Sequence, residues 1–70
     1  MKQIKQFFFN GEKYFIDQNV TILELIQYFN FNTYFLVLEY NTFICKRDSW
    51  STIVIKNQDQ IEIITIVGGG

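Results

Sequence analysis

The sequence predicts a small two-layer α+β domain, in which one helix packs across one face of a mixed sheet of four to five strands. Three observations lead to this prediction. The chain has 70 residues and a mass of 8.4 kDa, which is enough for one domain around one core. An Asn-Gly pair separates two strand-like runs near the start of the chain, as in a β-hairpin. A single helical pattern follows, and further strand-like runs come after it.

The first two strands are predicted over 4–9 and 12–17, with the turn at Asn10-Gly11. Both central residues of a type I′ turn need a positive φ, which Asn and Gly tolerate. Alternation divides the side chains into two faces, one with Phe7, Phe9, Tyr14 and Ile16 and the other with Phe8 and Phe15. We expect Phe8 and Phe15 to pair across the strands. Because both faces carry aromatic residues, alternation leaves open which of them faces the core.

The helix is predicted to begin at Thr21 and to end near Asn30. Thr21 and Glu24 have the spacing of a capping box, and the residues on either side of this start have that of a hydrophobic staple. The apolar positions follow the i, i+3, i+4, i+7 rule and are Ile22, Leu25, Ile26 and Phe29. The polar face carries no lysine or arginine, which argues against a helix that lies on a membrane surface.

Three more strands are predicted after the helix, over 34–40, 43–46 and 61–67. Leu36 and Leu38 are expected to point inward in the first of them. The resulting order is β, β, α, β, β, β, and its compact solution at this length is the β-grasp, the fold of ubiquitin. We predict a domain over 1–67 and a flexible tail over 68–70.

The composition argues against a self-sufficient enzyme. The chain has no histidine, the usual general base and commonest metal ligand, and we expect no metal site and no bound cofactor. Cys45 is expected to be a partly buried thiol, and the carboxylates are dispersed and mostly solvated. A net charge of −1 disfavours nucleic acid as a partner, and no apolar run reaches the ~20 residues of a membrane span. We expect a soluble intracellular protein.

Three of the four glycines are Gly68, Gly69 and Gly70, directly after the last predicted strand. One interpretation is a plain flexible tail or a cloning remnant. The other is that the carboxylate of Gly70 is the reactive group and that an ATP-dependent enzyme activates it. Three extended residues span roughly 10 Å, and a narrow channel admits glycine because it has no side chain. The protein would then be a substrate and carrier.

The segment NTFICKRDSW at 41–50 and the ending DQIEIITIVGGG at 59–70 closely resemble the thiamine-pathway sulfur carrier family, ThiS. The resemblance extends from about Phe7 to Gly70. It differs at the turn before the last strand, where the family usually has glycine and this chain has Gln58. A positive φ would then have to fall on Asn57 or be avoided. We expect Arg47 and Trp50 to hold the irregular segment between strands by packing and hydrogen bonds.

The resemblance implies the β-grasp fold and a set of partners. An E1-like (ThiF-type) enzyme adenylates the carboxylate that matches Gly70, and a persulfide, such as that of a cysteine desulfurase, supplies sulfur. The product is a thiocarboxylate (1-thioglycine), from which a ThiG-type thiazole synthase takes sulfur for the thiazole ring of thiamine. Gly68 and Gly69 would thread into the partners' active sites. A bacterial cytoplasm or a plastid stroma is the expected location.

Two questions stay open at the level of sequence. One alternative function is a sulfur carrier for molybdopterin or another sulfur-transfer pathway. Another is a ubiquitin-like interaction module that is never activated. The helix-free sheet face is a candidate docking surface for partners, with Phe8, Phe15, Phe35 and Ile64 or Ile66 as its apolar residues. Scattered exposed apolar residues or a homodimer contact are the other interpretations of this face.

Overall fold

The computed structural model describes residues 3–65 and contains five strands and one α-helix. In chain order these are β1 (Lys5–Phe9), β2 (Glu12–Ile16), α1 (Ile22–Tyr28), β3 (Leu36–Tyr40), β4 (Phe43–Cys45) and β5 (Gln60–Thr65). Two short 3₁₀ helices, η1 (Thr33–Phe35) and η2 (Arg47–Ser49), lie between them. The predicted order of elements is confirmed.

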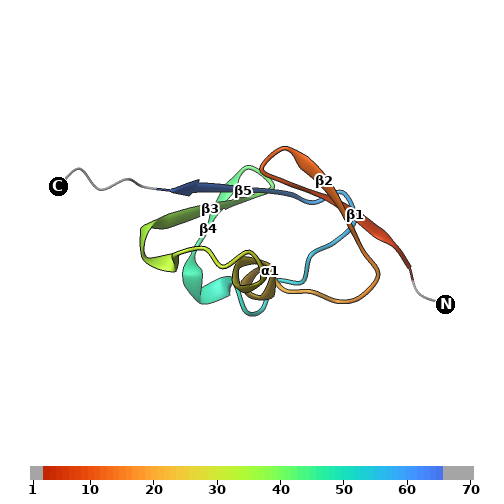
Figure 1. Cartoon of the computed structure of the whole chain (residues 1–70), viewed down its shortest axis with the longest axis horizontal. Coiled ribbons are helices and arrows are strands. Elements are labelled where there is room, and N and C mark those ends of the chain that lie inside the picture. The colour runs from red at the N-terminus through yellow and green to blue at the C-terminus, as the bar shows by residue number, and fades with distance from the viewer. Residues whose placement is uncertain (1–2, 66–70) are drawn as a thin grey trace.

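All five strands form one sheet in the order β2-β1-β5-β3-β4. β1 and β5 are parallel, and the other neighbours are antiparallel, so the sheet is mixed. The last strand in the chain is therefore the middle strand of the sheet. Helix α1 lies below the sheet in Figure 1, on one of its two faces. This is the predicted two-layer β-grasp arrangement.

The β1–β2 hairpin turns at Asn10 and Gly11, with φ values of 52° and 81°. Phe9 and Glu12 pair on either side of this two-residue turn. The expected cross-strand pair of Phe8 and Phe15 is wrong, because the register sets Phe8 opposite Lys13 and Phe15 opposite Gln6. The two phenylalanines share a face but are diagonal neighbours.

Helix α1 has the predicted capping box. The Thr21 hydroxyl accepts a hydrogen bond from the Glu24 backbone N–H at 3.1 Å, and the Glu24 carboxylate accepts one from the Thr21 N–H at 2.9 Å. At the other end Asn30 adopts φ 59°, and its N–H donates to the Gln27 carbonyl at 3.1 Å. A positive φ with this bond is a Schellman-type end, which stops the helix at the predicted residue.

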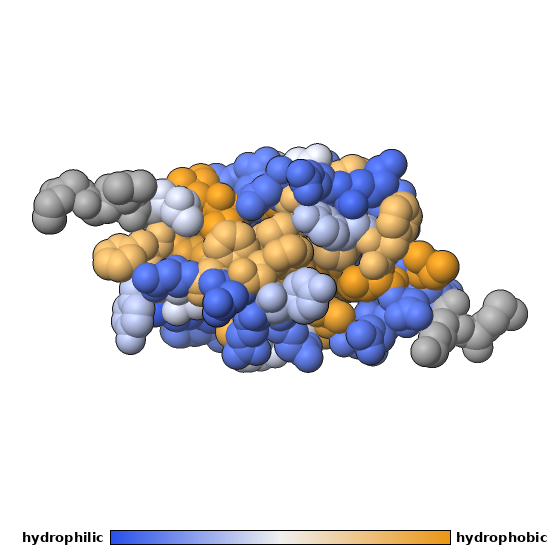
Figure 2. Space-filling view, viewed as in Figure 1, coloured by the Kyte–Doolittle hydropathy of each residue, from blue (hydrophilic) through white to orange (hydrophobic). Residues whose placement is uncertain are grey.

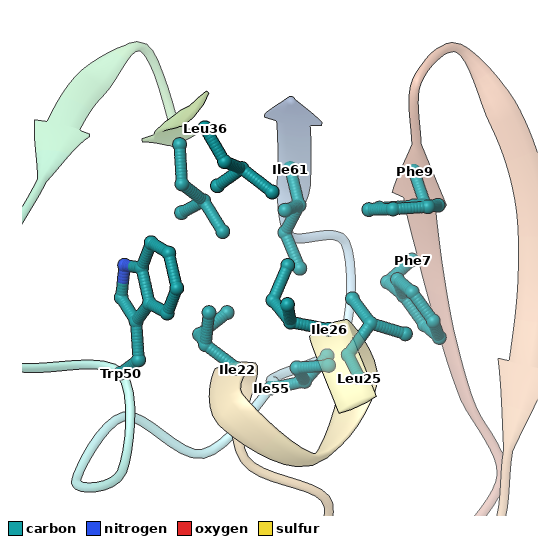
Figure 3. Close-up of a cluster of buried hydrophobic side chains, with 10 residues drawn as sticks. Phe7, Phe9, Ile22, Leu25, Ile26, Leu36, Trp50, Ile55 and Ile61 are labelled. Atoms are coloured by element: carbon teal, nitrogen blue, oxygen red, sulfur yellow. The ribbon is translucent and has the colours of Figure 1, made fainter. Parts of the chain in front are cut away.

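The core lies between the sheet and the helix (Figure 3). Its buried residues are Phe7, Phe9, Ile22, Leu25, Ile26, Leu36, Leu38, Trp50, Ile55 and Ile61. These include Leu36 and Leu38, which the sequence predicted to point inward. Burial of Phe7 and Phe9 shows that their face of the hairpin is the core face. Phe29 extends this core, because its ring stacks on Phe9 with centroids 4.9 Å apart.

One predicted strand begins too early. Tyr34 and Phe35 lie in η1, and β3 begins at Leu36. The Asn32 side chain accepts a hydrogen bond from the Tyr34 N–H at 3.1 Å, which closes a local turn. Asn side chains offer the backbone this alternative to a sheet ladder. The next strand ends at Cys45 and not at Lys46.

Candidate functional site

β5 is the strand that leads to the three terminal glycines. β1 pairs with it on one side at Gln60 and Ile61, and β3 pairs with it on the other side from Ile61 to Thr65. In Figure 1 its arrowhead lies near one end of the molecule, far from the N-terminal end. β5 is therefore held on both sides near its start and by β3 alone toward Thr65.

An asparagine from each hairpin turn contacts the backbone of β5. On the β1 side, the Asn10 N–H donates to the Ile61 carbonyl at 2.9 Å, and Asn10 Oδ1 accepts from the Ile63 N–H at 2.8 Å. On the β3 side, the Asn41 N–H donates to the Gln60 carbonyl at 2.7 Å, and Asn41 Oδ1 accepts from the Gln60 N–H at 2.7 Å. The sequence predicted both turns but not these contacts.

Asp59, just before β5, is buried, and its carboxylate accepts three hydrogen bonds. Its carboxylate accepts from Tyr40 Oη at 2.5 Å, from Asn41 Nδ2 at 3.0 Å and from the Lys56 N–H at 2.7 Å. Burial, followed by the bond to the Asp59 carboxylate, raises the pKa of Tyr40. From the sequence, Asp59 was grouped with the dispersed carboxylates. Only its position next to a polar turn, at the start of a strand, could have indicated that it is buried.

The turn before β5 corrects a second expectation. The positive φ falls on Gln58 itself, at 72°, and not on Asn57. The Asn57 side chain is engaged elsewhere, since its Oδ1 accepts from the Gln6 N–H at 2.8 Å. The Gln58 N–H donates to the Gln6 carbonyl at 2.6 Å, which ties this turn to the strand next to β5.

Arg47 and Trp50 hold the irregular segment after β4, as predicted. Trp50 is buried, and its Nε1–H donates to the Cys45 carbonyl at 3.1 Å. The Arg47 guanidinium lies 5.9 Å from the ring centroid of Tyr34 and 5.8 Å from that of Trp50, and it donates to the Thr33 carbonyl. Stacking and a hydrogen bond together fix this side chain against η1.

Groups able to carry catalysis are scarce in the part of the chain that the structure describes. Cys45 is partly buried, and burial raises its thiol pKa, which lowers the fraction of reactive thiolate. Within residues 3–65 no three Asp, Glu, Cys or His side chains come together as a metal site would need. None of the helices in that same range is long and apolar enough to cross a membrane.

A groove of about 470 Å³ lies between β2 and α1, with Phe7, Phe15 and Phe29 among its lining residues. Its only lining carboxylate, that of Glu24, is already bonded to Thr21 in the capping box. Figure 2 shows a wider band of apolar residues across the viewed face, between hydrophilic margins. The groove is therefore an apolar surface without a free acid or base.

The candidate docking residues fall on the predicted face only in part. Phe8, Phe15 and Ile64 belong to strands, and alternation places them on the face opposite the helix; Phe15 is 62% exposed and Ile64 48%. Phe35 is 54% exposed but belongs to η1. Its sequence neighbour Leu36 pairs with Thr65, so Phe35 lies near the end of β5. Ile66, Gly68, Gly69 and Gly70 lie outside the described residues.

Comparisons with known proteins give one family and several relatives. The model of the ThiS family matches residues 2–70. The uncharacterized protein ycf40 of Trieres chinensis is 52% identical over 94% of this chain and 90% of its own length. The ycf40 protein of Porphyra purpurea is 34% identical over 87% of this chain and 86% of its own.

A solved structure gives the same fold. The thiamine biosynthesis protein ThiS from Geobacter metallireducens superposes with a TM-score of 0.79 and covers 93% of this chain and 99% of its own. At 20% identity this similarity shows the fold alone. The family itself is shown by the family model, which spans nearly the whole chain. By sequence and by fold the chain belongs to the ThiS family, and its role is that of a small sulfur-carrier-like protein.

Proposed function

We propose that the protein carries sulfur as a thiocarboxylate at Gly70 for the formation of the thiazole ring of thiamine. The observation that carries this proposal is the place of β5. The strand that precedes the Gly-Gly-Gly ending is the middle strand of the sheet and is held on both sides near its start and by β3 up to Thr65, in a chain that the ThiS family model matches over 2–70. Such a domain is a rigid handle for a short segment without side chains.

The proposed chemistry belongs to the partners. An E1-like (ThiF-type) adenylating enzyme joins the Gly70 carboxylate to the α-phosphorus of ATP, and pyrophosphate leaves. The terminal sulfur of a persulfide, such as that of a cysteine desulfurase, then attacks the acyl carbon, and AMP leaves. A thiol cleaves the resulting acyl disulfide and is itself oxidised, which leaves a 1-thioglycine thiocarboxylate. A ThiG-type thiazole synthase consumes that sulfur.

The domain itself would contribute recognition. The face opposite the helix offers Phe8, Phe15 and Ile64, and Ile44, which is 71% exposed, lies on the same face opposite Glu39. We propose that the adenylating enzyme docks there while it receives the segment beyond β5. Changing Phe8 and Phe15 to Ser should raise the KM for the carrier and leave the domain folded. Equal turnover with the wild-type protein would contradict this docking role.

Intact mass spectrometry tests the carrier function. The protein is incubated with ATP, an E1-like adenylating enzyme and a sulfur source, and we expect the mass increase of one oxygen replaced by sulfur. Deletion of Gly70 should abolish the increase. No change in mass, under conditions that charge a control ThiS protein, would overturn the proposal. Transfer of the sulfur to a molybdopterin-forming enzyme, in place of a thiazole synthase, would assign the alternative pathway.

The plastid stroma is the compartment that we propose, since the relatives from Trieres chinensis, Porphyra purpurea and Pyropia yezoensis are ycf40 proteins, which are plastid-encoded. The bacterial cytoplasm was the other location expected from the sequence. Fractionation of the source cells, followed by detection of the protein in the stromal fraction with an antibody against the domain, checks this assignment.

A further inference from the structure

Asn10 and Asn41 continue two hydrogen-bond ladders of β5 beyond the points where the neighbouring strands turn away. β1 pairs with β5 only at Gln60 and Ile61, and then the chain turns. Asn10 Oδ1 takes the place of the next backbone carbonyl and accepts from the Ile63 N–H at 2.8 Å. Asn41 Oδ1 does the same for the Gln60 N–H on the β3 side. Neither bond is part of an ordinary strand pair.

The backbone at these two positions narrows the choice of residue. Asn10 and Asn41 have φ values of 52° and 51°, because each is the first residue of a two-residue turn. Asparagine tolerates this conformation better than most residues and also provides a short amide side chain. Glycine would adopt the turn and lose the oxygen. The two demands are independent, so the turn and the contact to β5 can be separated by mutation.

The apolar pattern of β5 leaves its register poorly defined. Ile61 is buried and Ile63 is packed against the core, and both point toward the helix. A slip by two residues would put Ile63 in the place of Ile61 and still leave an isoleucine inward. Such a slip would displace the following chain by roughly 6.6 Å, twice the rise per residue. Together with the buried Asp59 directly before β5, the side-chain oxygens of Asn10 and Asn41, which each bond one particular N–H, select one register.

We propose that Asn10 and Asn41 are positioning residues for the reaction at Gly70: by fixing the register of β5 they set how far the chain beyond Thr65 reaches into the adenylating enzyme. This inference rests on the proposed function. Gly70 is the fifth residue after Thr65, and five residues span at most roughly 18 Å. The displacement of roughly 6.6 Å that a two-residue slip causes is more than a third of that reach.

The test compares turn-preserving variants in steady-state adenylation. The variants are Asn10→Gly alone and together with Asn41→Gly, and the assay is ATP–pyrophosphate exchange with the adenylating enzyme that charges the wild-type protein. We expect kcat to fall by ~10-fold or more, since an ångström of misplacement can cost ~100-fold. The KM for the carrier should change by less than about threefold, because the docking face is intact.

Two controls separate positioning from stability. Asn30→Gly makes the same substitution at a positive φ of 59°, at the end of α1 and away from β5, and should leave kcat unchanged. Asn10→Asp keeps an acceptor oxygen and should retain kcat. The same change at Asn41 is unsuitable, because it would place a second carboxylate against Asp59. All assays are run well below the melting temperature of each variant.

Amide hydrogen exchange provides a second readout. The Ile63 N–H should be protected in the wild-type protein and in Asn10→Asp, and should exchange faster in Asn10→Gly. Wild-type kcat in a folded Asn10→Gly Asn41→Gly protein would overturn the inference and leave the carrier function intact. If no adenylating enzyme charges the wild-type protein, the proposed function fails and this inference fails with it.

Discussion

Gln58→Gly should stabilise the protein, because Gln58 holds a conformation that favours glycine. Its φ is 72°, and its N–H donates to the Gln6 carbonyl at 2.6 Å, so the backbone cannot relax without the loss of that bond. A residue with a Cβ pays ~1–2 kcal/mol in the left-handed region. Glycine avoids this strain and loses ~0.5–1 kcal/mol of extra chain entropy on folding. Taken between the matching ends of these two ranges, the net gain is ~0.5–1 kcal/mol.

Thermal and urea unfolding measure this gain. For a domain of this size about 1 kcal/mol corresponds to ~4–8 °C in melting temperature, so we expect an increase of roughly 2–8 °C. The matched control is Gln58→Ala, which removes the same side chain but keeps a Cβ at positive φ. It should give no gain. Since the Gln58 side chain is exposed to solvent, its removal alone has little cost.

The reasoning would be refuted if Gln58→Gly lowered the free energy of unfolding, or if Gln58→Ala stabilised the protein equally. In the first case the turn would not be strained at Gln58. In the second the gain would come from loss of the glutamine side chain and not from relief at the backbone.

Three further predictions concern the fold around the site. The folded-state pKa of Tyr40 is raised from 10.0, so its contribution to stability is fully present below pH 10 and is lost as the pH rises above it. Between pH 9 and 11, urea unfolding should show a smaller loss of unfolding free energy in Tyr40→Phe than in the wild type. Equal losses in the two proteins would contradict the assignment. Glu39 and Glu62 are directly opposite each other on the helix-free face, so Glu62→Gln should raise the free energy of unfolding by ~0.2–1 kcal/mol at low salt and by less at high salt, whereas Asp17→Asn, away from that pair, should not show this gain. Thr21→Ala should lower the free energy of unfolding by ~1 kcal/mol through loss of the capping box, and Thr21→Ser should retain most of that stability. Identical melting curves for the Ala and Ser variants would argue against the cap.

Prediction from sequence was most accurate where the signal is local. The Asn10-Gly11 turn, the Thr21–Glu24 capping box and the helix end at Asn30 each depend on residues within a few positions of one another. Side-chain hydrogen bonds and backbone dihedrals of near neighbours decide such features, so no tertiary contact is needed to predict them. The same local physics explains one error, because the Asn32 side chain turns the chain at Tyr34 and shortens the predicted strand.

The candidate site was predictable only in outline. The Gly-Gly-Gly ending and the resemblance at 41–50 pointed to the ThiS family, and the family model confirms it. Periodicity gave the face of Phe8 and Phe15 but not their register, which set Lys13 opposite Phe8. Alternation defines which side of a strand is buried, and pairing register depends on the partner strand as well.

The sequence by itself determined the order of elements and the two-layer fold class. Only the tertiary structure decided that β5 is the middle strand, that Asp59 is buried against Tyr40 and Asn41, and that Asn10 holds Ile63. The partners in these last contacts are 19, 18 and 53 residues apart in the chain. No local pattern encodes such separations, because they arise when the hairpins and the last strand meet in one sheet.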